Sequence, residues 1–297
     1  MPLLTSKPAK PGKRLSKLRK SLRRRLDYLR YGRGRNVVKV HSISPDTKRF
    51  PRPNFIIIGA PKCGTSWLQR ALWQHPDILI VPDEIEYFSM HLDYPVEWYL
   101  NHFSRVKRES RIGLRASHVL GEKSARYCSI PHDRIRLMHF LLPDVRLILM
   151  TRDPVARAWS QAKRFFSKRR FNNREGGVLG VPRDELLDYF EGIRPLGEFS
   201  VMIANWTDVY PKEQLMIVSQ EKSLELPRKA YDAVLAHIGA TTDYDPAAIK
   251  LLEAETNLGP KLSMPTDIRD YLEVMLGAER DRLHALLGDR TAVYVED

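Results

Sequence analysis

Residues 54–72 read NFIIIGAPKCGTSWLQRAL, a strand-like run, a loop and a helical pattern in succession. It opens with an apolar run at 55–58, whose β-branched side chains are typical of a buried parallel strand. A loop with two glycines follows at 59–66, and residues 67–72 carry apolar side chains at helical spacing. A strand, a glycine loop and a helix in this order direct unpaired backbone N–H groups and a positive helix end toward an anion. The stretch therefore predicts an anion-binding loop.

The side chains of this loop favour an anion site over an ordinary strand-to-helix turn. Lys62 supplies a point charge, and Thr65 and Ser66 supply hydroxyl donors. The ATP-type pattern GxxxxGK[ST] requires lysine directly after its second glycine, but here Thr65 follows Gly64 and Lys62 lies two residues before it. An ammonium in that place approaches a ligand from another side, so ATP or GTP is not the first expectation.

Length and composition indicate one α/β domain with additions. The chain has 297 residues, of which 43% are hydrophobic and 29% charged, which supports a sizeable core. Its net charge is +13, but residues 1–35 hold thirteen Lys or Arg and one acid, and so carry +12. About +1 is left for the other 262 residues. Because the basicity is confined to one end, we expect no specific nucleic-acid partner.

Residues 1–35 form a basic arm, partly amphipathic or disordered, and residues 36–52 a proline-containing linker. Within the arm, leucines recur at helical spacing among arginines and lysines over residues 13–30. Such a helix suits an anionic membrane surface. A solvated arm is the alternative, and the sequence leaves both open.

The chain shows no secretory signal and no apolar run of 18 residues. Its two cysteines, Cys63 and Cys128, make no disulfide framework, which fits a reducing compartment. We therefore expect a cytoplasmic protein, with peripheral contact at the inner membrane surface as the alternative that the arm leaves open.

Three further apolar runs, at 78–81, 145–150 and 214–219, predict strands, and helical patterns alternate with them. This alternation predicts a single doubly wound parallel sheet flanked by helices, with a ligand crevice beyond the carboxyl ends of its strands. Residues 105–120 are charged and fit no regular element, and the end of the chain reads as a pair of helices.

A second anion-binding group follows the strand at 145–150. Arg152 comes directly after this strand, and Ser160 lies about two turns along the next helix. Arg152 is suited to clamp a phosphate, and Ser160 can donate one more hydrogen bond. The competing interpretation is that Arg152 pairs with Asp153 or a neighbouring acid, although Asp153 followed by Pro154 is also typical of a helix start. Two anion sites in one crevice favour a ligand with two separate phosphate groups.

Five segments together resemble the sulfotransferases that use PAPS (3′-phosphoadenylyl sulfate). These are GAPKCGTSWL (59–68), PDEIEYF (82–88), VEWY (96–99), GEKSARY (121–127) and LILMTRDPVARAWS (147–160). The likeness covers about residues 53–220 and is greatest to the glycan sulfotransferases of the heparan type and their bacterial relatives. It implies a sulfotransferase domain over 53–297 with a P-loop-like 5′-phosphosulfate loop. It also implies metal-free, in-line transfer of sulfonate from PAPS, with PAP as the product, to a hydroxyl or amine. The expected acceptor is a carbohydrate or a lipid-linked glycan.

The resemblance also implies the residues that hold the cofactor. They are Lys62, Cys63, Gly64, Thr65, Ser66, Trp67, Arg152, Ser160 and Lys261. Lys62 would neutralise the bridging oxygen as sulfonate leaves, and Arg152 with Ser160 would bind the 3′-phosphate. Trp67 matches a position that can stack adenine, but it is equally well a core aromatic. Lys261 only weakly matches a closing basic loop.

Three residues are implied on the acceptor side. Glu84 matches the catalytic glutamate of the glycan enzymes, and Lys123 matches a second active-site lysine. The competing interpretations are a helix-capping Glu84 and a surface Lys123. The phenol and steroid branch of the family uses a histidine base, but its surrounding motif is absent here, and His118 is only the fallback candidate for the base.

Two other functions stay open at this stage. One is a nucleotide kinase or ATPase with a variant phosphate loop. The other is a polyanion- or membrane-binding protein that acts through its basic arm.

Overall fold

The computed structural model describes residues 49–109, 118–166, 177–252 and 262–287. The basic arm, most of the linker and Lys261 lie outside these ranges. The interpretations placed on them, including membrane contact through residues 13–30, stay predictions.

Five parallel strands form one sheet in the order β2-β3-β1-β4-β5. The strands are β1 (Phe55–Gly59), β2 (Ile78–Ile80), β3 (Val119–Lys123), β4 (Arg146–Thr151) and β5 (Leu215–Ser219). The apolar run that opens the anion loop is thus the central strand, and all five of its residues are buried. The predicted parallel sheet is confirmed.

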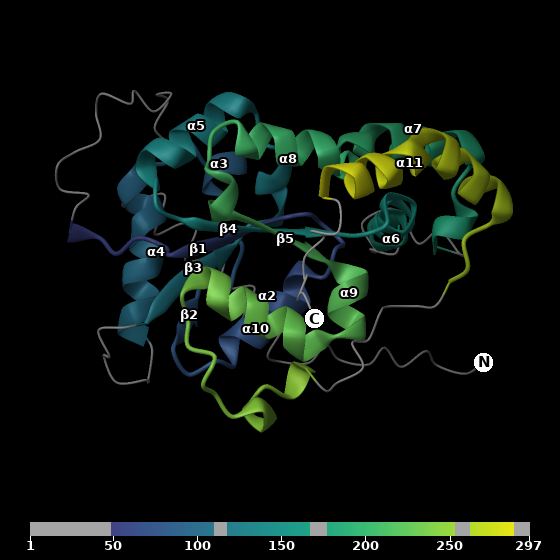
Figure 1. Ribbon diagram of the computed structural model, residues 1–297. Coiled ribbons are helices and arrows are strands. Elements are labelled where there is room, and N and C mark those ends of the chain that lie inside the picture. Colours follow the sequence, from purple (N-terminus) through teal and green to yellow (C-terminus); the bar gives the residue numbers. More distant parts are fainter. Residues whose placement is uncertain (1–48, 110–117, 167–176, 253–261, 288–297) are drawn as a thin grey trace, which may run out of the picture.

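Helices cover both faces of the sheet, as expected for a doubly wound fold. On one face lie α2 (Thr65–Trp73), α9 (Gln220–Glu225) and α10 (Pro227–Ile238), and on the other α5 (His132–Leu141) and α8 (Phe199–Thr207) (Figure 1). A second cluster of buried apolar side chains joins α6 (Pro154–Phe166), α7 (Arg183–Ile193) and α11 (Thr266–Leu287). This cluster fixes α6, the helix that follows β4.

Strand β3 is the element that sequence analysis did not find. Its first two residues fall in the segment to which no element was assigned, and the rest read as a polar connection. The strand is nevertheless buried along its whole length, including Glu122 and Lys123. A strand with adjacent buried charges lacks the apolar signature of a central strand, so only its neighbours in the fold reveal it.

Two helices also differ from expectation. Helix α4 runs from Val96 to Glu109, so its last turn lies in the segment 105–120 that fitted no regular element. The last described part of the chain is one 22-residue helix, α11, and not a pair of helices. Its polar residues do not interrupt it because one side packs on α6 and α8.

The topology gathers the predicted motifs at one edge of the sheet. At its carboxyl end β1 is flanked by β3, where the Ser124 N–H donates to the Ile57 carbonyl at 3.1 Å. On the other side is β4, where the Ala60 N–H donates to the Met150 carbonyl at 2.9 Å. The anion loop therefore lies between the residues that follow β3 and those that follow β4.

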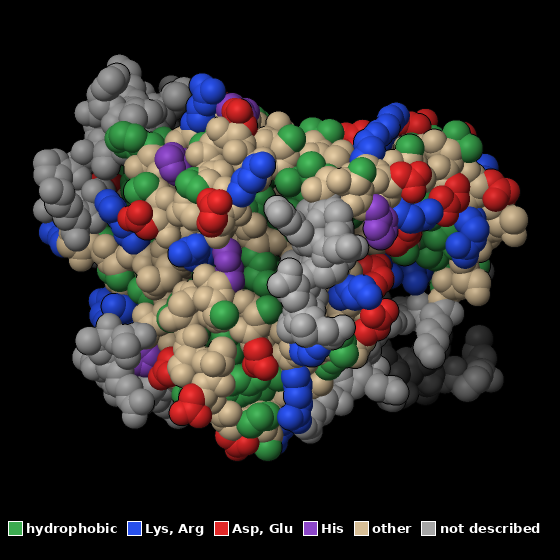
Figure 2. Space-filling view, viewed as in Figure 1, with side chains coloured by type: hydrophobic (Ala, Val, Ile, Leu, Met, Phe, Trp, Pro, Cys, Tyr) green, Lys and Arg blue, Asp and Glu red, His purple; other side chains and the backbone are tan. Residues whose placement is uncertain are grey.

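Acidic and basic side chains are interspersed on the face of the molecule shown in Figure 2. Among the described residues, no helix is both long and apolar enough to cross a membrane.

We predict that Gly121→Ala destabilises the fold by about 1–3 kcal/mol, because overpacking forces neighbouring atoms to shift. A Cβ at Gly121 would lie 2.2 Å from the Phe55 ring, inside the pair of strands β1 and β3. The measurement is the free energy of unfolding in urea. Gly192→Ala is the matched control, because a Cβ there meets nothing within 4 Å in helix α7. It should leave stability unchanged or raise it by up to about 1 kcal/mol, and equal effects at both sites would contradict the prediction.

Candidate active site

The loop between β1 and α2 has the backbone of an anion-binding turn. Gly64, the residue before α2, has φ +88° and ψ +3°, in the left-handed region that glycine adopts freely. Among the described residues, no side chain caps this helix. The first N–H groups of a helix have no partner within the helix. The first turn of α2 therefore presents its N–H groups and its positive dipole end at the carboxyl edge of the sheet.

Arg152 and Lys62 lie together, as the two predicted anion sites require. The Arg152 guanidinium donates from Nη1 to the Lys62 carbonyl at 3.2 Å, so β4 and the β1 loop are joined directly. Burial lowers the pKa of the Lys62 ammonium, and the nearby charges of Arg164, Arg152 and Lys163 lower it further. Three further cations therefore lie near Lys62, and an anion bound among them would relieve their repulsion.

The competing partner of Arg152 is engaged elsewhere. Asp153 accepts a hydrogen bond from the Ala156 N–H at 2.7 Å and so caps α6. Its second oxygen accepts from Arg280 of α11, also at 2.7 Å. The helix-start interpretation of Asp153 is confirmed, and the pairing of Arg152 with Asp153 is not found.

Two of these cations, Lys163 and Arg164, were not predicted. They follow the half-buried Ser160 by three and four residues on α6, and residues so spaced share one helix face. Burial and the charge of Arg152 lower the pKa of Lys163. The helical spacing from Ser160 was the signal in the sequence that could have identified them.

The remaining predicted cofactor residues differ in exposure. Thr65 is buried and Ser66 is exposed at the start of α2. Cys63 is fully buried, and burial raises its thiol pKa to about 12, as expected of a small filler and not of a reactive thiol. Trp67 is 8% exposed and belongs to the main hydrophobic core. Its stacking on adenine stays a prediction.

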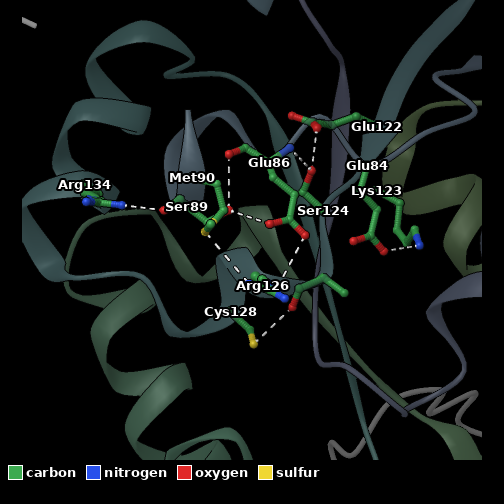
Figure 3. A network of polar contacts seen from close by, with 11 residues as sticks. Glu84, Glu86, Ser89, Met90, Glu122, Lys123, Ser124, Arg126, Cys128 and Arg134 are labelled. Carbon is green, nitrogen blue, oxygen red and sulfur yellow. Dashed lines mark hydrogen bonds and ion pairs between the residues drawn. The ribbon is translucent and has the colours of Figure 1, made fainter. Parts of the chain in front are cut away.

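The two residues predicted on the acceptor side form an ion pair. The Lys123 ammonium at the end of β3 contacts the Glu84 carboxylate, which lies between β2 and α3 (Tyr87–Met90) (Figure 3). The Lys123 side chain is 8% exposed and that of Glu84 36%. Lys123 is therefore not a surface lysine. Glu84 does not cap α3 either, because Glu86 is the residue before that helix and makes no capping bond.

A buried carboxylate lies beside this pair. Glu122 accepts hydrogen bonds from the Tyr99 hydroxyl at 2.7 Å and from the Ser124 hydroxyl at 2.9 Å. Burial raises its pKa to about 7, although both hydrogen bonds lower it, and the charges of Glu84 and Glu86 raise it further. Sequence analysis included Glu122 in a motif but gave it no role, since its burial depends on β3.

His118 does not join the site. It comes directly before β3, whereas Lys123 is the last residue of that strand. The two therefore lie at opposite ends of a five-residue strand, and the fallback base is at the wrong edge of the sheet.

The geometry defines a class of protein. A central βα loop with an open helix end and several cations beside it is typical of proteins that bind a phosphate-bearing nucleotide. The carboxylate–lysine pair lies one strand away from this loop. The cations fit such a ligand, because carboxylates of the described residues do not neutralise Lys62 or Arg152.

Comparison with known proteins identifies the family. The profile of the family described as "Sulfotransferase domain" matches residues 52–250, so this chain belongs to that family, whose cofactor is PAPS. The solved structure of a sulfotransferase from Alicyclobacillus acidocaldarius is similar over 80% of this chain and 96% of its own, with 26% identity and a TM-score of 0.60.

Two curated relatives are similar over shorter stretches. The membrane-associated sulfotransferase kil1 of Dictyostelium discoideum is 38% identical over 110 residues, which cover 37% of this chain and 22% of that protein. The heparan sulfate glucosamine 3-O-sulfotransferase 6 of Mus musculus is 26% identical over 192 residues, covering 62% of this chain and 50% of the relative. This chain thus matches half or less of the length of either relative.

We predict that Glu122 makes stability fall as pH rises through the window between 4.5 and about 7. A raised pKa means that the folded state holds the proton more tightly than the unfolded state, so the carboxyl favours folding most below 4.5 and least above 7. Relative to that of Glu122→Gln, the unfolding free energy of wild type should fall by roughly 2–3 kcal/mol between pH 5 and pH 8. Urea unfolding at both pH values measures it, and parallel pH profiles would contradict it.

Proposed function

We propose that this protein transfers the sulfonyl group of PAPS to a hydroxyl or amine of an acceptor, most simply a carbohydrate. The observation that carries the proposal is the gathering of two functional pairs at one sheet edge. Arg152 contacts the Lys62 loop on one side, and Lys123, with its partner Glu84, adjoins the same loop on the other. PAPS and the acceptor substrate would meet at the end of the central strand.

PAPS supplies an activated sulfonyl group when it is bound, and the chain supplies its surroundings. The backbone from Cys63 to Ser66 would hold the 5′-phosphate, and Lys62 would neutralise charge on the oxygen that the sulfonyl group leaves. Arg152 and Ser160 would hold the 3′-phosphate, with the charges of α6 nearby. A site of this kind would discriminate strongly against a nucleotide without that phosphate, because its donors would stay unpaired.

On the acceptor side, Glu84 would take the proton of the attacking hydroxyl or amine. Lys123 would hold the Glu84 carboxylate in place through their ion pair and contact the transferred group or the acceptor. The names of the heparan and carbohydrate sulfotransferase relatives favour a carbohydrate acceptor. A lipid-linked glycan at a cytoplasmic membrane surface is a narrower form of this proposal, in keeping with the name of the kil1 relative and the basic arm.

We expect Arg152→Ala to weaken PAP binding about 10- to 100-fold, the usual value of a charge-assisted hydrogen bond. Titration calorimetry with EDTA present measures it. Arg146→Ala is the matched control, since Arg146 begins the same strand and its guanidinium donates to the Glu213 carbonyl at the other edge. PAP affinity that is equal in both variants would contradict the 3′-phosphate assignment.

The same calorimetry distinguishes a sulfotransferase from the rival enzyme, a nucleotide kinase or ATPase. Tight PAP binding without magnesium supports a sulfotransferase. ATP binding that requires magnesium, with no PAP binding, would instead support a nucleotide kinase or ATPase.

We expect Glu84→Gln to lower kcat by about 10²- to 10⁴-fold, the usual contribution of a general base, with PAP affinity unchanged. Sulfonate transfer from labelled PAPS to a panel of carbohydrate acceptors measures it. Glu225→Gln, which removes an exposed carboxylate paired with Lys222 on α9, is the control and should keep wild-type turnover. Near-full turnover of Glu84→Gln would show that the base lies elsewhere.

A further inference from the structure

The segment that carries Glu84 is held at both ends by buried side chains. At its start, the Gln69 amide from α2 donates to the carbonyls of Val81 at 2.9 Å and Pro82 at 3.3 Å. At its end, the Glu86 N–H donates to the Ser124 hydroxyl oxygen at 3.0 Å. Glu84 therefore lies in a short span fixed between the helix of the anion loop and the end of β3.

The hydroxyl that holds this span has a fixed orientation. A serine hydroxyl can donate one hydrogen bond, and Ser124 donates it to the Glu122 carboxylate at 2.9 Å. The lone pairs of the hydroxyl oxygen are therefore left to accept from the Glu86 N–H. Glu122 is itself held by the Tyr99 hydroxyl of α4 at 2.7 Å. Neither Ser124 nor Glu122 is exposed, so water does not compete for these bonds. Figure 3 shows the bonds that Ser124 makes to Glu122 and to the Glu86 N–H.

The backbone at Glu86 needs such a restraint. Its φ of +54° and ψ of +29° place a residue with a side chain in the left-handed region, which costs roughly 1–2 kcal/mol. Such a conformation persists only where several contacts enforce it. Besides Ser124, these are the Ser89 hydroxyl, which donates to the Glu86 carbonyl at 3.2 Å, and Arg126, whose guanidinium lies 3.6 Å from the Glu86 carboxylate.

We propose that Ser124, fixed by the buried Glu122, is a positioning residue that holds Glu84 against Lys123. Lys123 and Ser124 are consecutive, and their side chains point to opposite sides of the chain, one to Glu84 and one to the backbone of Glu86. The end of β3 thus fixes the position of both Lys123 and Glu84. The inference rests on the proposed function, in which Glu84 is the base.

The expected consequence is a loss of turnover without a loss of cofactor binding. A displacement of about 1 Å in a reacting group can cost about 10²-fold in rate. Ser124→Ala should therefore lower kcat about 10- to 100-fold, with the KM for PAPS and the affinity for PAP within about twofold of wild type. Normal PAP binding also shows that the variant is folded. If Ser124→Ala does not fold, Ser124→Cys keeps nearly the same volume, weakens both hydrogen bonds and serves in its place.

Ser200→Ala is the matched control. The Ser200 hydroxyl on α8 donates at 3.0 Å to Glu279 of α11, a carboxylate that is 2% exposed. It therefore has the same chemistry as the bond between Ser124 and Glu122, in a part of the molecule that does not contact Glu84. A purely structural role for Ser124 would give both variants similar losses of stability and unchanged kcat, and that result would overturn the proposal.

A double variant separates this inference from the proposed function. If Ser124 acts through Glu84, adding Ser124→Ala to Glu84→Gln should lower kcat by less than about twofold further. An equal loss in both backgrounds would overturn the positioning role. Reduced turnover of Glu84→Gln with wild-type turnover of Ser124→Ala overturns the positioning role alone. Full turnover of Glu84→Gln overturns the base assignment and the positioning role together.

Discussion

The hydrogen bond from Arg152 to the Lys62 carbonyl is the contact on which the arrangement of the site depends. It exists because β1 and β4 are parallel neighbours, so that the loops after both strands leave the sheet at the same edge. The bond brings a guanidinium and an ammonium to one place, where like charges repel each other. The fold tolerates this repulsion at a place where a bound anion with several charges would remove it. A ligand that does so also stabilises the folded state by mass action.

The opposite flank of the central strand meets a different constraint. Glu122 and Lys123 are charged residues in a strand that the sheet buries. A buried charge is tolerated only when it is paired and hydrogen-bonded. Lys123 meets this condition through Glu84, and Glu122 through two hydroxyl groups. The cost of burying these groups is spread over a network that also orders the segment from β2 to α3.

Sequence reasoning succeeded where the signal is local. The strand and loop around Lys62, the strand before Arg152 and the helix start at Asp153 all rest on apolar runs, turn residues and capping residues within a few positions. It did not succeed for β3 or for the end of the chain. The five residues of β3 carry two charges that are stable only beside α4 and the Glu84 segment, and α11 is a single helix because it packs on α6 and α8.

The class of fold, the strand, loop and helix around Lys62 and the strand and helix around Arg152 can be read from the sequence alone, because periodicity and short motifs encode strands, turns and helix ends locally. Which of these residues meet depends on the three-dimensional packing. It placed Arg152 on the Lys62 loop and Lys123 against Glu84, added Lys163 and Arg164 to the cation cluster, and left His118 at the far end of β3. The physical reason is that strand order and burial follow from packing between distant segments, and no local pattern reports which strands become neighbours.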